Sequence, residues 1–239
     1  KIKLIFFSIL ALIVLLFSLF YIQDFRIDAS SDTLVAQNDE KFKYYNSYNK
    51  IFKSDNFLVL AVENKKEIEK NLIKNFELIS TNLMELETVS QVFSFIDAPI
   101  LFLNNTSLST LNAENIENLR NSDLDLKKVI KEFSQNPIYV EQIINKNANV
   151  FSIIIYLKSN LELIEARDKY ENSQISKKEY LDIKNINDEK RKNLIDNIRI
   201  IILNADQEYT YYLGGVEMIA NDVIDFVKND IIIFSLSVI

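Results

Sequence analysis

Two pairs of carboxylates have the residue type and spacing that could do chemistry. Asp28 and Asp32 lie four residues apart, and Asp222 and Asp225 lie three apart, so each pair would share one face of a helix. Two acids on one face can bind calcium or act as a general acid and a general base. Neither pair has a third acid clustered with it or a glycine-containing ligand loop, so we interpret both as helix caps and solvated surface.

Other catalytic and cofactor-binding patterns are missing from the sequence. The chain has no His and no Cys, which excludes a His-based triad, an imidazole acid or base, and disulfides. The G-x-S-x-G pattern of a hydrolase is absent, and Gly214-Gly215 lacks the spacing and the Lys-Ser/Thr of a phosphate-binding loop. We therefore expect no enzyme activity, no cofactor and no metal, and a membrane-anchored hydrolase is disfavoured.

The charge of the chain limits its partners. Of 27 basic residues, Lys1 and Lys3 precede the first apolar run, which leaves 25 against 34 acidic residues, a net charge of −9 from residue 24 onward. Such a surface disfavours nucleic acid, which is bound by clustered Lys and Arg. At 48% hydrophobic residues, including 16 Phe and 11 Tyr, the chain has enough apolar side chains to bury a core.

The element that would position the rest of the chain is the apolar run at residues 4–22. It contains no charge, Pro or Gly, and at ~1.5 Å per residue a helix of about this length crosses a hydrocarbon core of roughly 30 Å. A secretory signal peptide is the alternative, but its apolar core is usually shorter and ends at a small-residue cleavage site. The run ends in Phe-Tyr-Ile-Gln instead, which favours a retained membrane helix.

Hydrophobic periodicity predicts the elements between residues 24 and 213. Strands are expected at residues 57–62, 88–95 and 208–213, and residues 138–144 and 150–158 are expected to form a hairpin joined by the turn-rich residues 145–149. Helices are expected at residues 65–84, 113–120 and 124–134, the last capped by Ser122, and a further helix face at residues 194–202 should dock on the sheet. The charged residues 160–192 are expected to be a solvated helix or a mobile insertion.

Gly214 and Gly215 follow the last predicted strand, where a helical pattern begins at Val216. They predict a sharp strand-to-helix corner. An amphipathic helix should follow and lead into the apolar residues 231–239, which we interpret as the start of a second membrane helix in a fragment of a longer chain.

The order of elements predicts an α+β fold with a ferredoxin-like (split βαβ) core and a helical insertion. We divide the chain into a first transmembrane helix (residues 1–23), an extracytoplasmic porter-like domain (residues 24–228) and the start of a second transmembrane helix (residues 229–239). Because two lysines precede the first helix, the N-terminus is expected in the cytoplasm.

Five stretches resemble the bacterial RND superfamily of exporters, nearest to its MmpL-like and hydrophobe/amphiphile-exporter-type branch. They are DASSDTL at 28–34, SDNFLVL at 54–60, NPIYVEQII at 136–144, IIIYLK at 153–158 and YLGGVEMIANDVIDFVKND at 212–230. The motif residues singled out within them are Asp28, Ser31, Asp32, Ser54, Asp55, Gly214, Gly215, Asn221 and Asp222. Two residues depart from the pattern. Glu217 stands where the family commonly has Pro, which we expect to loosen the corner, and Lys53 stands where it often has Gly, which we expect to alter the turn into the strand.

The resemblance implies a proton-driven transporter in the bacterial cytoplasmic membrane, built as two repeats, each with an extracytoplasmic porter domain. Membrane lipids, a hydrophobic or amphiphilic substrate and further copies of the full-length protein (a dimer or trimer) are the implied partners. The family's proton-carrying acids lie in later membrane helices, and no acid lies in residues 4–22 or 231–239.

A second hypothesis stays open. A domain between two membrane helices is also the layout of ligand-sensing receptors and sensor kinases. Four further apolar segments and a second copy of the pattern after residue 239 would favour the exporter, and one span followed by a cytoplasmic coiled coil would favour the receptor.

Overall fold

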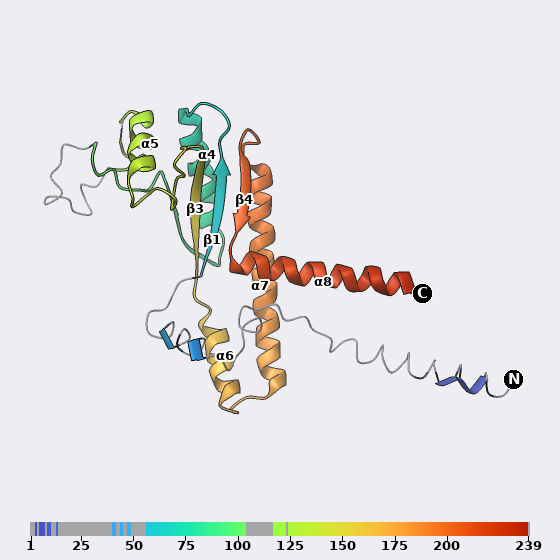
Figure 1. Cartoon of the computed structure of the whole chain (residues 1–239). Helices are drawn as coiled ribbons and strands as arrows, with labels where there is room; N and C mark the ends of the chain where they lie inside the picture. The colour runs from blue at the N-terminus through green and yellow to red at the C-terminus, as the bar shows by residue number, and fades with distance from the viewer. Residues whose placement is uncertain are drawn as a thin grey trace.

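The computed structural model describes residues 56–103, 117–122 and 124–238, together with single residues between 3 and 13 and between 40 and 48. Within these ranges the chain forms an α+β domain in which helices cover one face of an antiparallel sheet (Figure 1). The elements are β1 (Phe57–Glu63), α4 (Lys70–Met84), β2 (Val89–Ser94), α5 (Leu126–Gln135), β3 (Val150–Leu157), α6 (Leu161–Glu171), α7 (Lys177–Asn204), β4 (Thr210–Gly214) and α8 (Val216–Val238).

The sheet has the strand order β2-β3-β1-β4, and every neighbouring pair is antiparallel. β1 and β2 are joined through α4 with β3 between them, and β3 and β4 are joined through α7 with β1 between them. Two β-α-β units are thus interleaved in one sheet. The α+β class expected from the sequence is confirmed, as are strands in the predicted regions 57–62, 88–95, 150–158 and 208–213.

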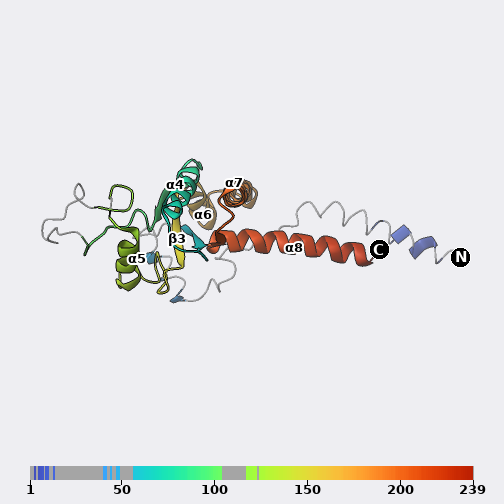
Figure 2. The ribbon, with the colours of Figure 1, turned by 90° about the horizontal axis from the view of Figure 1, so that it is seen from above.

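The core lies between this sheet and helices α4 and α7. Leu58, Leu60 and Val62 of β1 are fully buried, because alternate residues of a strand point to the same face. Above them, Phe76 of α4 makes an edge-to-face contact with Phe95 at 4.7 Å between ring centroids. Figure 2 shows α4 and α7 on one side of β3, which leaves α5 on another side.

The predicted helix at 65–84 is confirmed from residue 70 onward. Asn64 delays its start, since the Asn64 side chain accepts a hydrogen bond from the Lys66 N–H at 3.0 Å and its own N–H donates to the Asn149 carbonyl. These bonds hold residues 64–66 in a turn. One face of α4 is buried as predicted, through Leu72, Phe76, Ile79 and Leu83.

The strand predicted at 138–144 is wrong. The N–H groups of Tyr139, Val140 and Ile143 donate to carbonyls three or four residues earlier, and Glu141 has a positive φ of 62°. Tyr139 and Ile143 are buried at a spacing of four residues, which suits a turn better than the alternation of a strand. Only isolated bridges, one of them between Ile144 and Phe151, remain of the predicted hairpin.

The predicted helix at 113–120 is also not supported where the structure describes it. Residues 117–120 form an irregular turn, and residues 113–116 lie outside the described ranges. The next helix begins later than expected because Asp125, and not Ser122, caps it: the Asp125 carboxylate accepts from the Lys127 N–H. Ser122 accepts instead from the Leu124 N–H.

The charged segment at 160–192 forms an ordered helical hairpin. Asn160 caps α6, and a capping box between Ser176 and Glu179 starts α7, which runs unbroken through the helix face predicted at 194–202. The Asn160 amide donates to the Asn187 side chain, and the rings of Tyr170 and Tyr180 stack at 5.0 Å. Leu194 and Ile198 of the predicted docking face are buried, together with Ile195, and Ile201 and Ile202 of that face are partly buried.

Tyr139 gives the domain a dependence on alkaline pH. Burial, with a smaller contribution from the nearby Glu132 carboxylate, raises the pKa of Tyr139 to about 12, and its hydroxyl donates to the Pro99 carbonyl at 2.7 Å. Because the folded state holds this proton more tightly than the unfolded state, whose tyrosine pKa is about 10, stability should fall as pH rises from 10 toward 12.

We expect Tyr139→Phe to flatten that fall in urea titrations between pH 8 and pH 11, with Tyr170→Phe on the exposed helical hairpin as the control. An equally steep fall in Tyr139→Phe would contradict the prediction.

Candidate functional site

The corner between β4 and α8 requires glycine at one of its two positions. Gly215 has a φ of +135°, a region that other residues rarely adopt. A Cβ there would lie 2.7 Å from the Leu58 side chain and 3.1 Å from the Phe57 carbonyl oxygen. A Cβ on Gly214 would meet only the Val59 carbonyl oxygen, at 3.9 Å. The predicted sharp corner is therefore confirmed, and Gly215 is the residue that makes it against the start of β1.

Helix α8 leaves this corner with its charged face against α7. Arg199 of α7 donates from one guanidinium nitrogen to both carboxylate oxygens of Asp222, at 2.7 and 2.8 Å. Asp225 lies 3.9 Å from the ammonium of Lys192. Since each acid of the pair 222/225 has its own cation, and the described residues hold no cluster of three metal-binding side chains, these acids act as docking contacts.

Glu217 occupies the position where we expected the departure from the family pattern to loosen the corner. It instead adds two contacts there, lying 3.7 Å from the guanidinium of Arg191 and accepting a hydrogen bond from the Asn56 amide at 3.2 Å. A carboxylate in the first turn of a helix also interacts favourably with the helix dipole. Glu217 thus ties α8 to both α7 and the residue that precedes β1.

Two buried donors on α7 and α8 have no hydrogen-bond partner among the described residues. They are the side-chain amide nitrogen of Asn221, a residue that is almost fully buried, and the Nε of Arg191. Buried polar groups without partners are uncommon and cost free energy. The contact between α7 and α8 thus includes ion pairs, and two buried donors near it are left unsatisfied.

The apolar face of α8 points away from the domain. Nine of its large apolar side chains between residues 216 and 234 are between 36% and 68% exposed, whereas Met218 and Ile224 are partly buried. The exposed set consists of Val216, Ile219, Val223, Phe226, Val227, Ile231, Ile232, Ile233 and Phe234. An amphipathic helix normally buries its apolar face against its own domain. In α8, Asp222 and Asp225 face cations of α7, Ala220 and Asn221 are buried, and the nine exposed apolar side chains are available to another environment.

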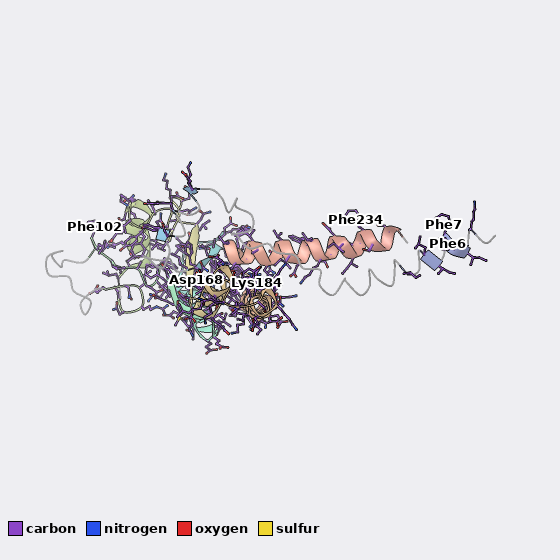
Figure 3. All side chains as sticks on the ribbon, turned by 90° about the horizontal axis from the view of Figure 1, so that it is seen from below. Phe6, Phe7, Phe102, Asp168, Lys184 and Phe234 are labelled. Atoms are coloured by element: carbon purple, nitrogen blue, oxygen red, sulfur yellow. The ribbon has the colours of Figure 1, made fainter. Side chains whose placement is uncertain are left out.

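The described residues near the N-terminus have the same character. Those between 3 and 13 are helical, and the apolar ones among them are between 46% and 67% exposed. Phe6, Phe7 and Phe234 lie on the same side of the molecule, away from the sheet (Figure 3). Among the described residues no helix combines the length and the apolar character needed to cross a membrane; in α8, Glu217, Asp222, Asp225, Lys228 and Asp230 precede the apolar run.

Of the motif residues singled out in the sequence, the structure brings four together at this corner: Gly214, Gly215, Asn221 and Asp222. Asp28, Ser31, Asp32, Ser54 and Asp55 lie outside the described residues. Sequence reasoning missed the cations Arg191, Lys192 and Arg199: it assigned the first two to a solvated segment and gave Arg199 no role. Their positions on one side of α7, opposite acids at 217, 222 and 225, were the signal available.

Compared with known proteins, the chain matches no protein-family model and no curated protein.

Proposed function

We propose that this chain is the N-terminal part of a proton-driven RND-type transporter that exports hydrophobic or amphiphilic, lipid-like substrates. The described domain would be its extracytoplasmic porter domain, on the outer side of the bacterial cytoplasmic membrane, and not an enzyme. The observation that carries the proposal is α8, which contacts α7 through ion pairs and leaves the domain with most of its large apolar side chains exposed. The choice of this particular superfamily rests on the resemblance of the five sequence stretches to it.

The sheet supports the assignment as a ferredoxin-like porter core. The order β2-β3-β1-β4 with two interleaved β-α-β units is the split βαβ arrangement. Fold alone does not define function, since many unrelated proteins share this topology. The sheet therefore supports the proposed ferredoxin-like fold. The proposed transport function rests on α8 and on the sequence resemblance.

The exposed side chains of α8 support a membrane setting on energetic grounds. Transfer of one large apolar side chain out of water contributes about 1.5–3 kcal/mol, and the apolar residues 231–234 of α8 are consecutive and exposed. Lipid or packed membrane helices would bury them. The helical residues near the N-terminus are exposed on the same side of the molecule, which supports a second helix inserted in the same membrane.

Mass spectrometry of the lipids that co-purify with the chain tests the substrate half of the proposal. We expect particular hydrophobic or amphiphilic molecules to be enriched over the lipids that accompany an unrelated membrane protein of similar size prepared in the same detergent. No enrichment would contradict an amphiphile exporter and favour the sensory alternative, in which the domain binds another ligand.

A topology experiment tests the membrane half. The chain has no Cys, so Lys146→Cys introduces a single thiol at an exposed position on the loop before β3. We expect a membrane-impermeant maleimide to label this thiol by at least about 80% of the lysed-cell value in intact spheroplasts, because the domain is extracytoplasmic. A Cys placed at Lys3 should react only after lysis; the reverse pattern would contradict the proposed orientation.

A further inference from the structure

An open cavity of about 490 Å³ lies between α5 and the segment that follows Pro99. Its apolar wall includes Phe102, Leu103 and Pro137, and its polar wall comes mainly from α5. Cavities of roughly 300–1,000 Å³ are the usual size for small-molecule sites. Phe102 and Phe234 lie at opposite ends of the molecule in Figure 3, so this cavity is distant from the end of α8.

Glu132 builds the wall of this cavity. One of its carboxylate oxygens accepts from the N–H groups of Leu101 and Phe102, at 2.8 and 3.2 Å, and the other accepts from the Leu103 N–H at 3.0 Å. Three backbone donors on one carboxylate fix the segment to α5. The backbone of Phe102 is therefore held in place while its ring stays 67% exposed.

The polar wall carries more positive than negative charge in an otherwise acidic protein. Lys128 and Lys131 are one helical turn apart on α5, and neither forms an ion pair with any residue in the described ranges. Glu132 is the acid among the lining residues, and its oxygens are occupied by the three N–H groups. A ligand would thus meet two available ammonium groups.

Asn136 lies beneath the wall of the same cavity. This residue is 5% exposed, and its side-chain oxygen accepts from the Ile138 N–H at 2.9 Å. Its amide nitrogen has no hydrogen-bond partner among the described residues and almost no solvent-accessible surface, so a ligand in the cavity does not reach it. Asn136 therefore shapes the floor of the cavity and is not itself a contact for a ligand.

From these features we infer that the cavity binds a single-chain amphiphilic anion with a carboxylate or phosphate head group. The head group meets Lys128 and Lys131, and the hydrocarbon chain lies on Phe102 and Leu103. To identify this ligand with the exported substrate, the inference rests on the proposed function. The binding experiment below requires no transport, so a failure of ligand binding at the cavity can be told apart from a failure of the proposed transport function.

The absence of tryptophan from the chain provides a direct reporter. Phe102→Trp places a single indole on the cavity wall, and its emission is recorded while octyl phosphate or octanoate is added to the full chain in phosphatidylcholine nanodiscs. We expect saturable binding that the double substitution Lys128→Gln and Lys131→Gln weakens at least about tenfold. Lys127→Gln, a cation of the same helix that does not line the cavity, should change affinity by less than about twofold.

The contributions of the head group and of the hydrocarbon chain to binding are then distinguished by comparing ligands. Octyl maltoside, which has the same chain and no charge, and inorganic phosphate, which has no chain, are each expected to bind at least about tenfold more weakly than octyl phosphate. Equal affinity for the maltoside, equal affinity for inorganic phosphate, equal weakening by Lys127→Gln, or no saturable binding would each overturn the inference.

Discussion

Replacing Gly215 by alanine is expected to lower the free energy of unfolding by about 3 kcal/mol. Two costs add at this position. The φ of +135° is unfavourable for any side chain, and the new Cβ would lie 2.7 Å from the Leu58 Cδ2 and 3.1 Å from the Phe57 carbonyl oxygen. The Leu58 side chain can rotate only into a packed core, and the carbonyl belongs to the backbone of β1.

Gly214→Ala is the matched control for this prediction. Its Cβ would make an ordinary contact of 3.9 Å with the Val59 carbonyl oxygen, so stability should change by less than about 1 kcal/mol. Urea denaturation of the full chain in a mild detergent, followed by circular dichroism, measures both variants. A similar loss in the two would mean that the glycine pair is needed only for flexibility, and would refute the specific role of Gly215.

Much of the sheet and its buried helices was predictable from periodicity. Leu58, Leu60 and Val62 alternate with less buried neighbours, and Leu72, Phe76 and Ile79 recur at helical spacing, so each segment carries its own local signal. The sharp corner between β4 and α8 was also predictable, because a Gly-Gly pair between a strand pattern and a helix pattern indicates such a turn.

The errors fall where side chains hydrogen-bond to the nearby backbone. Residues 138–144 have the composition of a strand, but the Asn136 side chain accepts from the Ile138 N–H and starts a series of turns. The helix at 126–135 starts late because Asp125 is a better cap in its local geometry than Ser122. Single side-chain bonds of this kind carry no periodic signal, so pattern analysis misses them.

The candidate sites were predictable only in part, because they depend on contacts between distant segments. Asp222 was visible in the sequence, but its partner Arg199 lies 23 residues earlier on another helix. The cavity depends on Glu132 bonding to the backbone of residues 101–103, about 30 residues away. Which groups meet across such separations is set by the crossing of helices and the path of loops.

Reversing the charge of Arg199 is expected to weaken the docking of α8 on α7, the second largest change in free energy that we predict. Arg199→Glu replaces the contact with Asp222 by the repulsion of two carboxylates, and we expect a loss of about 2 kcal/mol in the docking of α8 on α7. The figure is modest because both side chains are partly exposed to solvent. Adding Asp222→Arg should restore the attraction with its direction reversed, and Lys190→Glu, at an exposed position of α7, is the control.

The angle of α8 is the quantity that this substitution should change. Because the chain lacks Cys, nitroxide labels can be placed on Asp182→Cys of α7 and Asn229→Cys of α8, both exposed, and their separation measured by double electron–electron resonance. We expect Arg199→Glu to broaden the distance distribution and the double reversal to narrow it again. An unchanged distribution in Arg199→Glu would mean that Gly215 and Glu217 alone fix the direction of α8. The Arg199–Asp222 ion pair would then contribute nothing to the direction of the helix.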